Sequence, residues 1–377
     1  MNSANKPLVV LATGGTGGHV FPAEALAREL TAHNCSLSLF TDRRGGMFSG
    51  VLGELETHRI HAGGVAGKNI LNLLQSGPEL AIGLFQARRL LRKLQPSVVV
   101  GFGGYASFPT MLAACVGNYP TAIHEQNAVL GRANRLLVSW VASIATCFDT
   151  VEGLSEDALG KVNVTGMPVR MAVIEHQDSP YPDIAEDGEF RLLVIGGSQG
   201  ARVLSDVVPG AVAALPDGIR SRIRIVQQCR PEDLDRVRAA YNAMGVIAEL
   251  NNFFDDFPAR LASSHLVIAR AGASTVAEVA TVGRPSILGP FPYAADDHQA
   301  RNAHAVNDAG AGWILPEAAF SADTLRGRIE SLFGMPVVLE RTAANAKALG
   351  RPEAAKNLAN LVVQLIPNGV DGERRAP

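Results

Sequence analysis

The sequence of 377 residues predicts an α/β protein with two doubly wound, parallel-sheet domains. Short apolar runs typical of strands alternate along the chain with segments of helical spacing. A glycine-rich turn follows the first strand of each half, at residues 13–19 and 196–201. Residues 173–189 are rich in Pro, Asp and Glu, as linkers are, and we place the domain boundary near residue 168.

The strands are predicted in chain order from apolar runs bounded by glycine, proline or polar residues. In the first half these runs are 7–12, 36–41, 96–103, 120–126, 142–148 and 161–166. In the second half they are 190–197, 222–228, 245–253, 265–272 and 285–291. Apolar strands that alternate with helices are typical of parallel sheets covered on both faces. Such open sheets bind ligands at the carboxyl ends of their strands, so we expect a site in a cleft between the domains.

The composition argues against several classes of protein. With 47% hydrophobic and 19% charged residues, the chain is predicted to be globular, and its net charge of −2 gives no support to nucleic-acid binding. No run of about 18 apolar residues predicts a membrane span, and the N-terminus lacks the features of a signal peptide, so we expect a cytoplasmic protein. Scattered cysteines without a CxxC pair predict neither a disulfide framework nor a zinc site. They are Cys35, Cys115, Cys147 and Cys229.

The first glycine-rich turn joins a strand to a helix. It consists of Gly14, Gly15, Thr16, Gly17, Gly18 and His19. Unpaired N–H groups at a helix N-terminus favour an anion or a sugar, whereas the alternatives are a dinucleotide fingerprint or a plain tight turn. The spacing departs from GxGxxG, and Asp42, which could serve a ribose, is followed by two arginines. A dinucleotide needs no imidazole here, so His19 favours the first interpretation, although a lone histidine at a turn is more often structural.

Two further segments follow strands of the first half. Residues 101–109 form a second glycine-rich turn, with Gly103, Gly104 and Tyr105, that is either ordinary strand-end packing or part of a diphosphate site. His124, Glu125, Gln126 and Asn127 come consecutively where a later strand ends. A carboxylate and an amide near His19 would supply a base and an orienting partner.

The second half contains candidate residues for binding a nucleotide sugar. Ser198 is either a phosphate ligand or a helix N-cap, and Glu278 is either a ribose ligand or one member of a capping box with Thr275. His298, Gln299 and Asn302 have a spacing that suits sugar hydroxyls. The Asp-Asp pairs at 255–256 and 296–297 are not a DxD motif, so we predict no metal and no other cofactor.

Seven motifs in order along residues 8–350 carry a resemblance to a known family. They are GGTGGHVFPA, GFGGYASFP, HEQNAVLG, VTGMPVR, GGSQGA, ARAGASTVAE and HQARNA. Together they closely resemble the MurG family of bacterial N-acetylglucosaminyltransferases. The resemblance implies a GT-B fold and an inverting transfer of N-acetylglucosamine from UDP-N-acetylglucosamine to the C4 hydroxyl of lipid I, which makes lipid II in peptidoglycan synthesis. It also implies a peripheral location on the cytoplasmic face of the plasma membrane and partners among cell-wall and division proteins.

The resemblance also implies that the two domains bind different substrates. Residues 1–168 would bind lipid I and the membrane, residues 169–366 would bind the donor, with a last helix able to pack back on the first domain, and 367–377 would be a tail. Donor-contacting positions would be Thr16, Gly17, Asn127, Arg170, Ser198, Phe254, Gly272, Ala273, Ser274, Glu278, Gln299 and Asn302. The acceptor diphosphate would meet Gly14, Gly15, Gly17, Gly18, Gly103, Gly104 and Tyr105. His19 is the leading catalytic base and Glu125 its rival, because imidazole titrates near neutrality. Two positions depart from the family pattern, Met167 in place of the common Asn and Phe254 in place of an aliphatic residue.

Residues 68–96 combine apolar and basic side chains. The apolar ones are Leu73, Leu74, Leu80, Leu84 and Phe85, and the basic ones are Lys68, Arg88, Arg89, Arg92 and Lys93. The residues alone favour a core-facing helix with a solvated basic end, whereas the resemblance favours contact with an anionic membrane.

Three other functions remain alternatives. They are a GT-B transferase with a diacylglycerol or small-molecule acceptor, a nucleotide-sugar binding protein without turnover, and an NAD(P)-dependent dehydrogenase.

Overall fold

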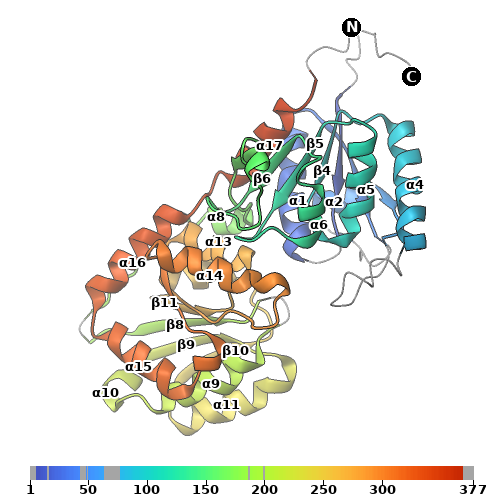
Figure 1. The fold of residues 1–377 in the computed structure, drawn as a ribbon. Helices are drawn as coiled ribbons and strands as arrows, with labels where there is room; N and C mark the ends of the chain where they lie inside the picture. The colour runs from blue at the N-terminus through green and yellow to red at the C-terminus, as the bar shows by residue number, and fades with distance from the viewer. Residues whose placement is uncertain are drawn as a thin grey trace. The chain divides into compact units, whose positions relative to one another are not determined.

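The computed structural model describes residues 6–14, 17–42, 48, 50–62, 77–185, 187–197 and 200–367. These residues form two compact units, shown in Figure 1. Unit 1 comprises the described residues up to Pro168 together with those from Glu353 onward, and unit 2 is Val169–Pro352. The predicted site residues Gly15, Thr16 and Ser198 lie outside the described residues.

Unit 1 contains a seven-stranded parallel sheet of order β3-β2-β1-β4-β5-β6-β7. Its strands are β1 Leu8–Ala12, β2 Ser36–Thr41, β3 Glu56–Arg59, β4 Val98–Gly101, β5 Thr121–Glu125, β6 Ser143–Thr146 and β7 Val162–Val164. Strand β1 is central and pairs with β2 on one side and β4 on the other, with Val9 opposite Leu37 and Val98. The strand order reverses direction between β1 and β4, and such switch points are where open α/β sheets bind ligands.

Helices cover this sheet on both faces. They are α1 Gly17–Ala32, α2 Gly50–Glu54, α4 Gly77–Leu94, α5 Gly104–Val116, α6 Arg132–Leu137, α7 Glu156–Leu159 and α17 Ala354–Gln364. On one face, α1 and α17 pack in a common core with alternate residues of β1 and β4, such as Leu11 and Val100. The other face receives α5, because a Cβ on Gly101 would lie 2.6 Å from Met111 Cγ. The second domain was predicted over 169–366 with a last helix able to pack back on the first domain, and in the structure the described residues from Glu353, which include α17, belong to unit 1.

Unit 2 contains a six-stranded parallel sheet of order β10-β9-β8-β11-β12-β13. Its strands are β8 Phe190–Ile195, β9 Ile223–Gln228, β10 Ile247–Asn251, β11 Leu266–Ala269, β12 Ser286–Leu288 and β13 Gly312–Ile314. Its helices are α8 Met171–Ile174, α9 Arg202–Ala213, α10 Asp217–Arg220, α11 Leu234–Ala243, α12 Phe257–Ser263, α13 Ala273–Val282, α14 His298–Asp308, α15 Ala322–Phe333 and α16 Pro336–Leu349. The order again switches at the first strand of the unit, between β8 and β11.

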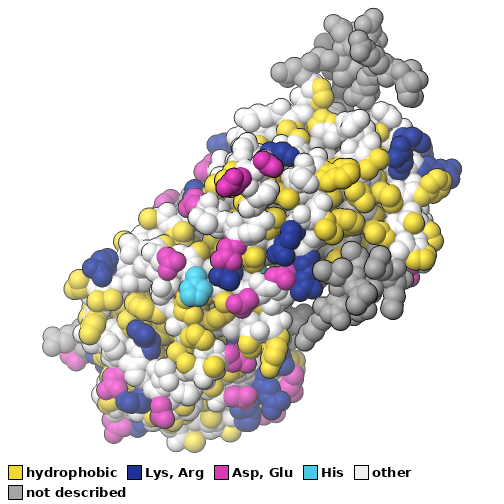
Figure 2. Space-filling model, viewed as in Figure 1, with side chains coloured by type: hydrophobic (Ala, Val, Ile, Leu, Met, Phe, Trp, Pro, Cys, Tyr) yellow, Lys and Arg dark blue, Asp and Glu magenta, His cyan; other side chains and the backbone are white. Residues whose placement is uncertain are grey.

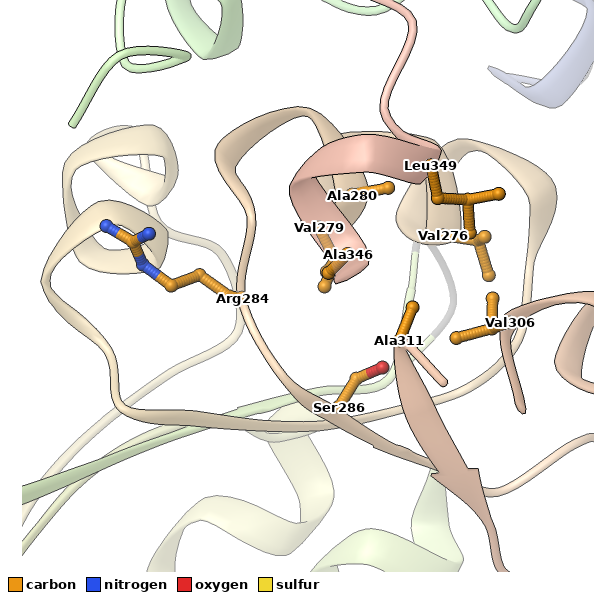
Figure 3. A pocket seen from close by; sticks show the side chains of 9 residues that line it. All are labelled: Val276, Val279, Ala280, Arg284, Ser286, Val306, Ala311, Ala346 and Leu349. Atoms are coloured by element: carbon orange, nitrogen blue, oxygen red, sulfur yellow. The ribbon is translucent and has the colours of Figure 1, made fainter. Parts of the chain in front are cut away.

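A small pocket lies in unit 2 between α13, α14, α16 and β12, and Figure 3 shows the side chains that line it. Its volume is about 10 Å³. Its lining is mostly apolar, with side chains such as Val276, Val306 and Leu349. A space of this size holds at most about one water molecule, so it is a packing defect and not a ligand site.

The segment predicted to be a linker is instead part of unit 2. The Tyr181 hydroxyl donates to the carbonyl of His265 at 2.9 Å, and the buried Arg284 guanidinium donates to the carbonyl of Pro180 at 2.8 Å. Arg284 also donates to the carbonyls of Val282 and Ala262, close to the ends of α13 and α12. The linker prediction for 173–189 was therefore wrong, because hydrogen bonds donated by the half-buried Tyr181 and the buried Arg284 attach this polar segment to the rest of unit 2.

Two strands were missed by the sequence analysis. Strand β3 has the sequence ETHR and lies at the edge of its sheet, where polar side chains meet solvent. Strand β13 is only three residues long and also lies at an edge. No helix among the described residues is both long enough and apolar enough to cross a bilayer.

Candidate active site

The two glycine-rich turns of unit 1 meet at the carboxyl ends of β1 and β4. The half-buried ring of His19 lies over the second turn, since a Cβ on Gly103 would be 3.5 Å from His19 Cε1 and one on Gly104 would be 3.4 Å from His19 Nε2. Both glycines have positive φ angles, 80° and 72°, which other L-residues rarely adopt. The predicted association of His19 with this turn is therefore present within unit 1.

Two helices begin at these turns. Helix α1 starts at Gly17, and α5 starts at Gly104 with Gly103 as its N-cap and no side chain capping it. Helix N-termini favour negative charge through their N–H groups and the helix dipole. The Gly18 position faces open space, whereas a Cβ on Gly14 would lie 3.2 Å from the Cβ of Ala106. Tyr105, on the first turn of α5, is half-buried.

Glu125 is buried at the end of β5 and accepts hydrogen bonds on both carboxylate oxygens. Its Oε1 accepts from Asn127 N at 3.0 Å and Asn127 Nδ2 at 3.4 Å, and its Oε2 accepts from Gly131 N at 2.9 Å and Asn134 Nδ2 at 2.8 Å. Burial raises the pKa of Glu125, and these hydrogen bonds oppose the rise. Because the carboxylate is only 2% exposed and its oxygens are engaged, its position favours a supporting role over that of a base.

A buried polar chain connects the ends of β4, β5 and β6. Gln126 Nε2 donates to the carbonyl of Phe102 at 2.8 Å and lies 3.3 Å from His124 Nδ1. His124 Nε2 lies 3.4 Å from Cys147 Sγ, which lies 3.7 Å from Met167 Sδ. Burial lowers the pKa of His124 to about 4, so it is neutral at pH 7. Met167, the departure from the family pattern, thus accepts a weak hydrogen bond from the Cys147 thiol.

Unit 2 presents its own turns at the carboxyl ends of β8 and β11. Gly196 needs to be glycine because a Cβ there would lie 2.2 Å from Ala201 N. The Gln228 side chain closes this turn, accepting from Gly196 N at 3.1 Å and donating to the carbonyl of Gly197 at 3.1 Å. At the end of β11, Gly272, Ala273 and Ser274 are partly exposed at the start of α13.

Glu278 of α13 is bound by Arg170. The guanidinium donates through Nε to Oε1 at 2.7 Å and through Nη2 to Oε2 at 3.0 Å, and it lies over the ring of Phe257. Burial raises the pKa of Glu278, and the bond to Arg170 opposes this. The capping-box alternative with Thr275 was wrong, because the helix begins at Ala273 with Gly272 as its N-cap.

The remaining residues of unit 2 that were predicted to contact UDP-N-acetylglucosamine lie in different environments. Gln299 is half-buried and accepts from Phe291 N at 3.0 Å. Asn302 is fully buried and donates to the carbonyl of Ala271 at 3.1 Å, which fixes the turn before α13. Phe254 is buried beneath the guanidinium of Arg260. Asn302 therefore supports the turn and does not face solvent beside Gln299.

Sequence reasoning overlooked two residues at these strand ends. Asn134, on α6, binds Glu125 from nine residues further along the chain. Arg270, which follows β11, donates to the carbonyls of Gly289 and Pro290 and pairs with Glu317 at 2.6 Å. Nothing in the local pattern separates Asn134 from an ordinary helix residue. Among the described residues, no cluster of three or more His, Cys, Asp or Glu side chains could hold a metal ion.

Comparison with known proteins identifies related chains. Models of the glycosyltransferase family 28 N-terminal and C-terminal domains match residues 9–146 and 191–358. A relative from Paramagnetospirillum magneticum is 57% identical over 97% of this chain and 99% of its own length. It is named UDP-N-acetylglucosamine–N-acetylmuramyl-(pentapeptide) pyrophosphoryl-undecaprenol N-acetylglucosamine transferase, as is a Rhodospirillum rubrum relative that is 52% identical over 95% of this chain and 92% of its own.

Solved structures agree with these matches. The crystal structure of Acinetobacter baumannii MurG has a TM-score of 0.77 and 27% identity, covering 95% of this chain and 99% of that one. A UDP-GlcNAc 2-epimerase from Neisseria meningitidis bound to UDP-GlcNAc has a TM-score of 0.63 at 14% identity, covering 96% of this chain and 100% of that one. At that low identity, the second likeness concerns the fold alone.

Proposed function

The chain belongs to the family of UDP-N-acetylglucosamine–N-acetylmuramyl-(pentapeptide) pyrophosphoryl-undecaprenol N-acetylglucosamine transferases, and from this membership we propose its reaction. It transfers N-acetylglucosamine from UDP-N-acetylglucosamine to lipid I and makes lipid II in peptidoglycan synthesis. The resemblance drawn from the seven motifs and the predicted GT-B fold are both confirmed.

His19 is the proposed catalytic base of an inverting transfer. The single observation that carries this assignment is the packing of its imidazole over the Gly103–Gly104 turn, where α5 begins. Backbone N–H groups at this turn and at the start of α1 would bind the acceptor diphosphate. A neutral imidazole beside them can take the proton of the C4 hydroxyl as that oxygen attacks the anomeric carbon. Glu125 is the weaker candidate, because four hydrogen bonds already occupy its oxygens.

Groups of unit 2 are proposed to stabilise the departing UDP. Arg170 offers a guanidinium and Gly272 to Ser274 offer the N–H groups that begin α13. Fixed donors of this kind stabilise a developing diphosphate charge without rearranging during the reaction. Glu278 would accept hydrogen bonds from the ribose diol. We propose that these groups suffice and that the transfer needs no metal.

Radiolabel transfer to a short-chain lipid I analogue, with EDTA present, tests the proposed reaction. We expect labelled lipid II analogue to form at the same rate with and without the chelator. Label on a diacylglycerol acceptor but not on lipid I would indicate the rival transferase. UDP-N-acetylglucosamine binding without transfer to either acceptor would indicate a binding protein, and loss of activity restored by a divalent cation would contradict metal independence.

Glu278→Ala should weaken UDP-N-acetylglucosamine binding about tenfold or more, as expected for the loss of hydrogen bonds to a charged group. The melting temperature should change little, because Arg170 is partly exposed and water can solvate it when its partner is removed. Isothermal titration calorimetry and thermal melting measure the two effects. The matched control is Glu330→Ala, which breaks a surface pair with Arg326 in the same unit. A loss of stability with unchanged affinity would make Glu278 a purely structural residue.

Helix α4 is the proposed membrane-contacting element of unit 1. It buries Gly83, Ala87 and Leu91 on one side, while the side chains on the other are exposed. The exposed face carries Ile82, Phe85, Arg89, Arg92 and Lys93. Figure 2 shows apolar and basic side chains together over this helix. Such a face suits an anionic leaflet, which supports a peripheral location on the cytoplasmic side of the plasma membrane, where partners in cell-wall synthesis and division would also be found.

Phe85→Ser should lower binding to phosphatidylglycerol-containing vesicles about tenfold, because the 68% exposed ring would lose its burial in the interface. Replacing Arg89 and Arg92 by Gln should cost about 1 kcal/mol for each charge. Vesicle co-sedimentation measures both effects. Val337→Ser, which changes a 75% exposed apolar residue of unit 2, is the control. Equal vesicle binding by the Phe85 variant and the unchanged protein would exclude α4 as the contact.

A further inference from the structure

Asn134 has an orientation fixed by its neighbour. Its side chain is 3% exposed on α6, and its Nδ2 donates to Glu125 Oε2 at 2.8 Å. A carboxylate can only accept hydrogen bonds, so a flipped amide would set two oxygens against each other. The carbonyl oxygen of Asn134 must therefore point away from Glu125.

This carbonyl oxygen has no partner in the described part of the chain. Asn134 Oδ1 is buried and accepts no hydrogen bond there, from protein backbone or side chain. A buried polar atom without a partner costs about 1–3 kcal/mol, so each one calls for an explanation. A side chain that lies beside Oδ1 and carries an N–H could satisfy it.

His19 is the ionisable side chain beside this amide. A Cβ on Gly103 would lie 3.5 Å from Asn134 Nδ2, 3.8 Å from Asn134 Oδ1 and 3.5 Å from His19 Cε1. The amide and the imidazole thus border the same point above the Gly103 turn, from α6 and α1 respectively. The Nδ1 atom of His19 is buried, as Oδ1 is.

We propose that Asn134 is a positioning residue for His19, and that its carbonyl oxygen accepts the N–H of the imidazolium that forms during transfer. This inference rests on the proposed function. In the step, the acceptor C4 hydroxyl loses its proton to one ring nitrogen of His19 while its oxygen bonds to the anomeric carbon. The bond from that carbon to the diphosphate breaks, and its electron pair leaves with UDP. The second ring nitrogen keeps the N–H that it already carries in the neutral imidazole, and as the ring becomes positively charged this N–H becomes a stronger donor to Asn134 Oδ1.

The arrangement gives Glu125 a part in catalysis without a proton transfer. Its carboxylate fixes the amide of Asn134, and the amide in turn fixes the imidazole. A base oriented by a third group is a recurring feature of nucleophile activation. Asn134 is suited to the middle position because an amide offers a donor to the carboxylate and an acceptor to the imidazolium.

A double-mutant cycle between Asn134 and His19 tests the proposal. Asn134→Ala should lower kcat for the lipid I analogue about 10- to 100-fold in the unchanged background, with the KM for UDP-N-acetylglucosamine within about twofold. In a His19→Ala background the same substitution should change kcat less than about twofold, because a positioning residue has no effect without the residue it positions. Equal losses in both backgrounds, or no loss in either, would overturn the proposal.

Two further variants separate positioning from folding. Asn134→Ser retains a hydroxyl that can donate to Glu125 and lacks the carbonyl, so it should behave as Asn134→Ala while melting at the temperature of the unchanged protein. Asn163→Ala is the control, because it removes an exposed amide of the same unit that donates to Ser143 Oγ, and it should leave kcat unchanged in both backgrounds. If Asn134→Ser retained full activity, the carbonyl would have no role. If the unchanged protein transferred no label, the proposed function itself would fail.

Discussion

His19→Ala is expected to lower the turnover number about 10²- to 10⁴-fold, the range typical of a lost general base. The affinity for UDP-N-acetylglucosamine should stay within about twofold, because His19 is proposed to act on the acceptor hydroxyl, whereas Arg170 and Glu278 of unit 2 are proposed to bind the donor. Single-turnover assays with a short-chain lipid I analogue measure the chemical step, and calorimetry measures donor binding.

His33→Ala is the matched control for this experiment, since His33 is exposed near the end of the same helix and should be dispensable. A His19→Ala protein with unchanged turnover would remove the imidazole from the mechanism. If Glu125→Gln abolished turnover at the same time, with the fold intact, the buried carboxylate would become the base.

Arg284→Met should lower the free energy of unfolding by about 3–5 kcal/mol, as expected when buried acceptors lose their donors. The guanidinium is 1% exposed and donates to the carbonyls of Pro180, Ala262, Val282 and Gly283. Burial lowers the pKa of Arg284 to about 10, so it remains charged at pH 7. Methionine fills much of the volume but satisfies none of these acceptors.

Urea denaturation measures this loss, and Arg284→Lys should recover little of it, because an ammonium cannot reach carbonyls spread around a planar guanidinium. The control is Arg238→Met, which breaks an exposed pair with Asp235 and should be nearly neutral. An unchanged denaturation midpoint for Arg284→Met would mean that the segment around Pro180 and Tyr181 is held by other contacts.

The parts of the fold that were predicted depend on local patterns. Strands such as Val98–Gly101 and Leu266–Ala269 are buried on both faces, so each is a continuous apolar run in the sequence. The edge strands Glu56–Arg59 and Gly312–Ile314 lack that signature, because an edge tolerates polar or very short segments. The capping box around Glu278 had the right spacing, but the helix starts three residues earlier than that box requires, with Gly272 and not Thr275 as its N-cap.

The sequence by itself determined the α/β class, the two glycine-rich turns, the family and most candidate residues. Strand burial, turn formation and motif spacing each depend on residues that are close together in the sequence, so local patterns predict them. Only the tertiary structure decided which side chains pair. It placed His19 on the turn of Gly103, joined Asn134 to Glu125 and Arg170 to Glu278, and fastened the segment 173–189 to unit 2. These pairings depend on strand order and helix packing, which bring residues far apart in the sequence close together in space. No local sequence pattern predicts which distant residues will meet.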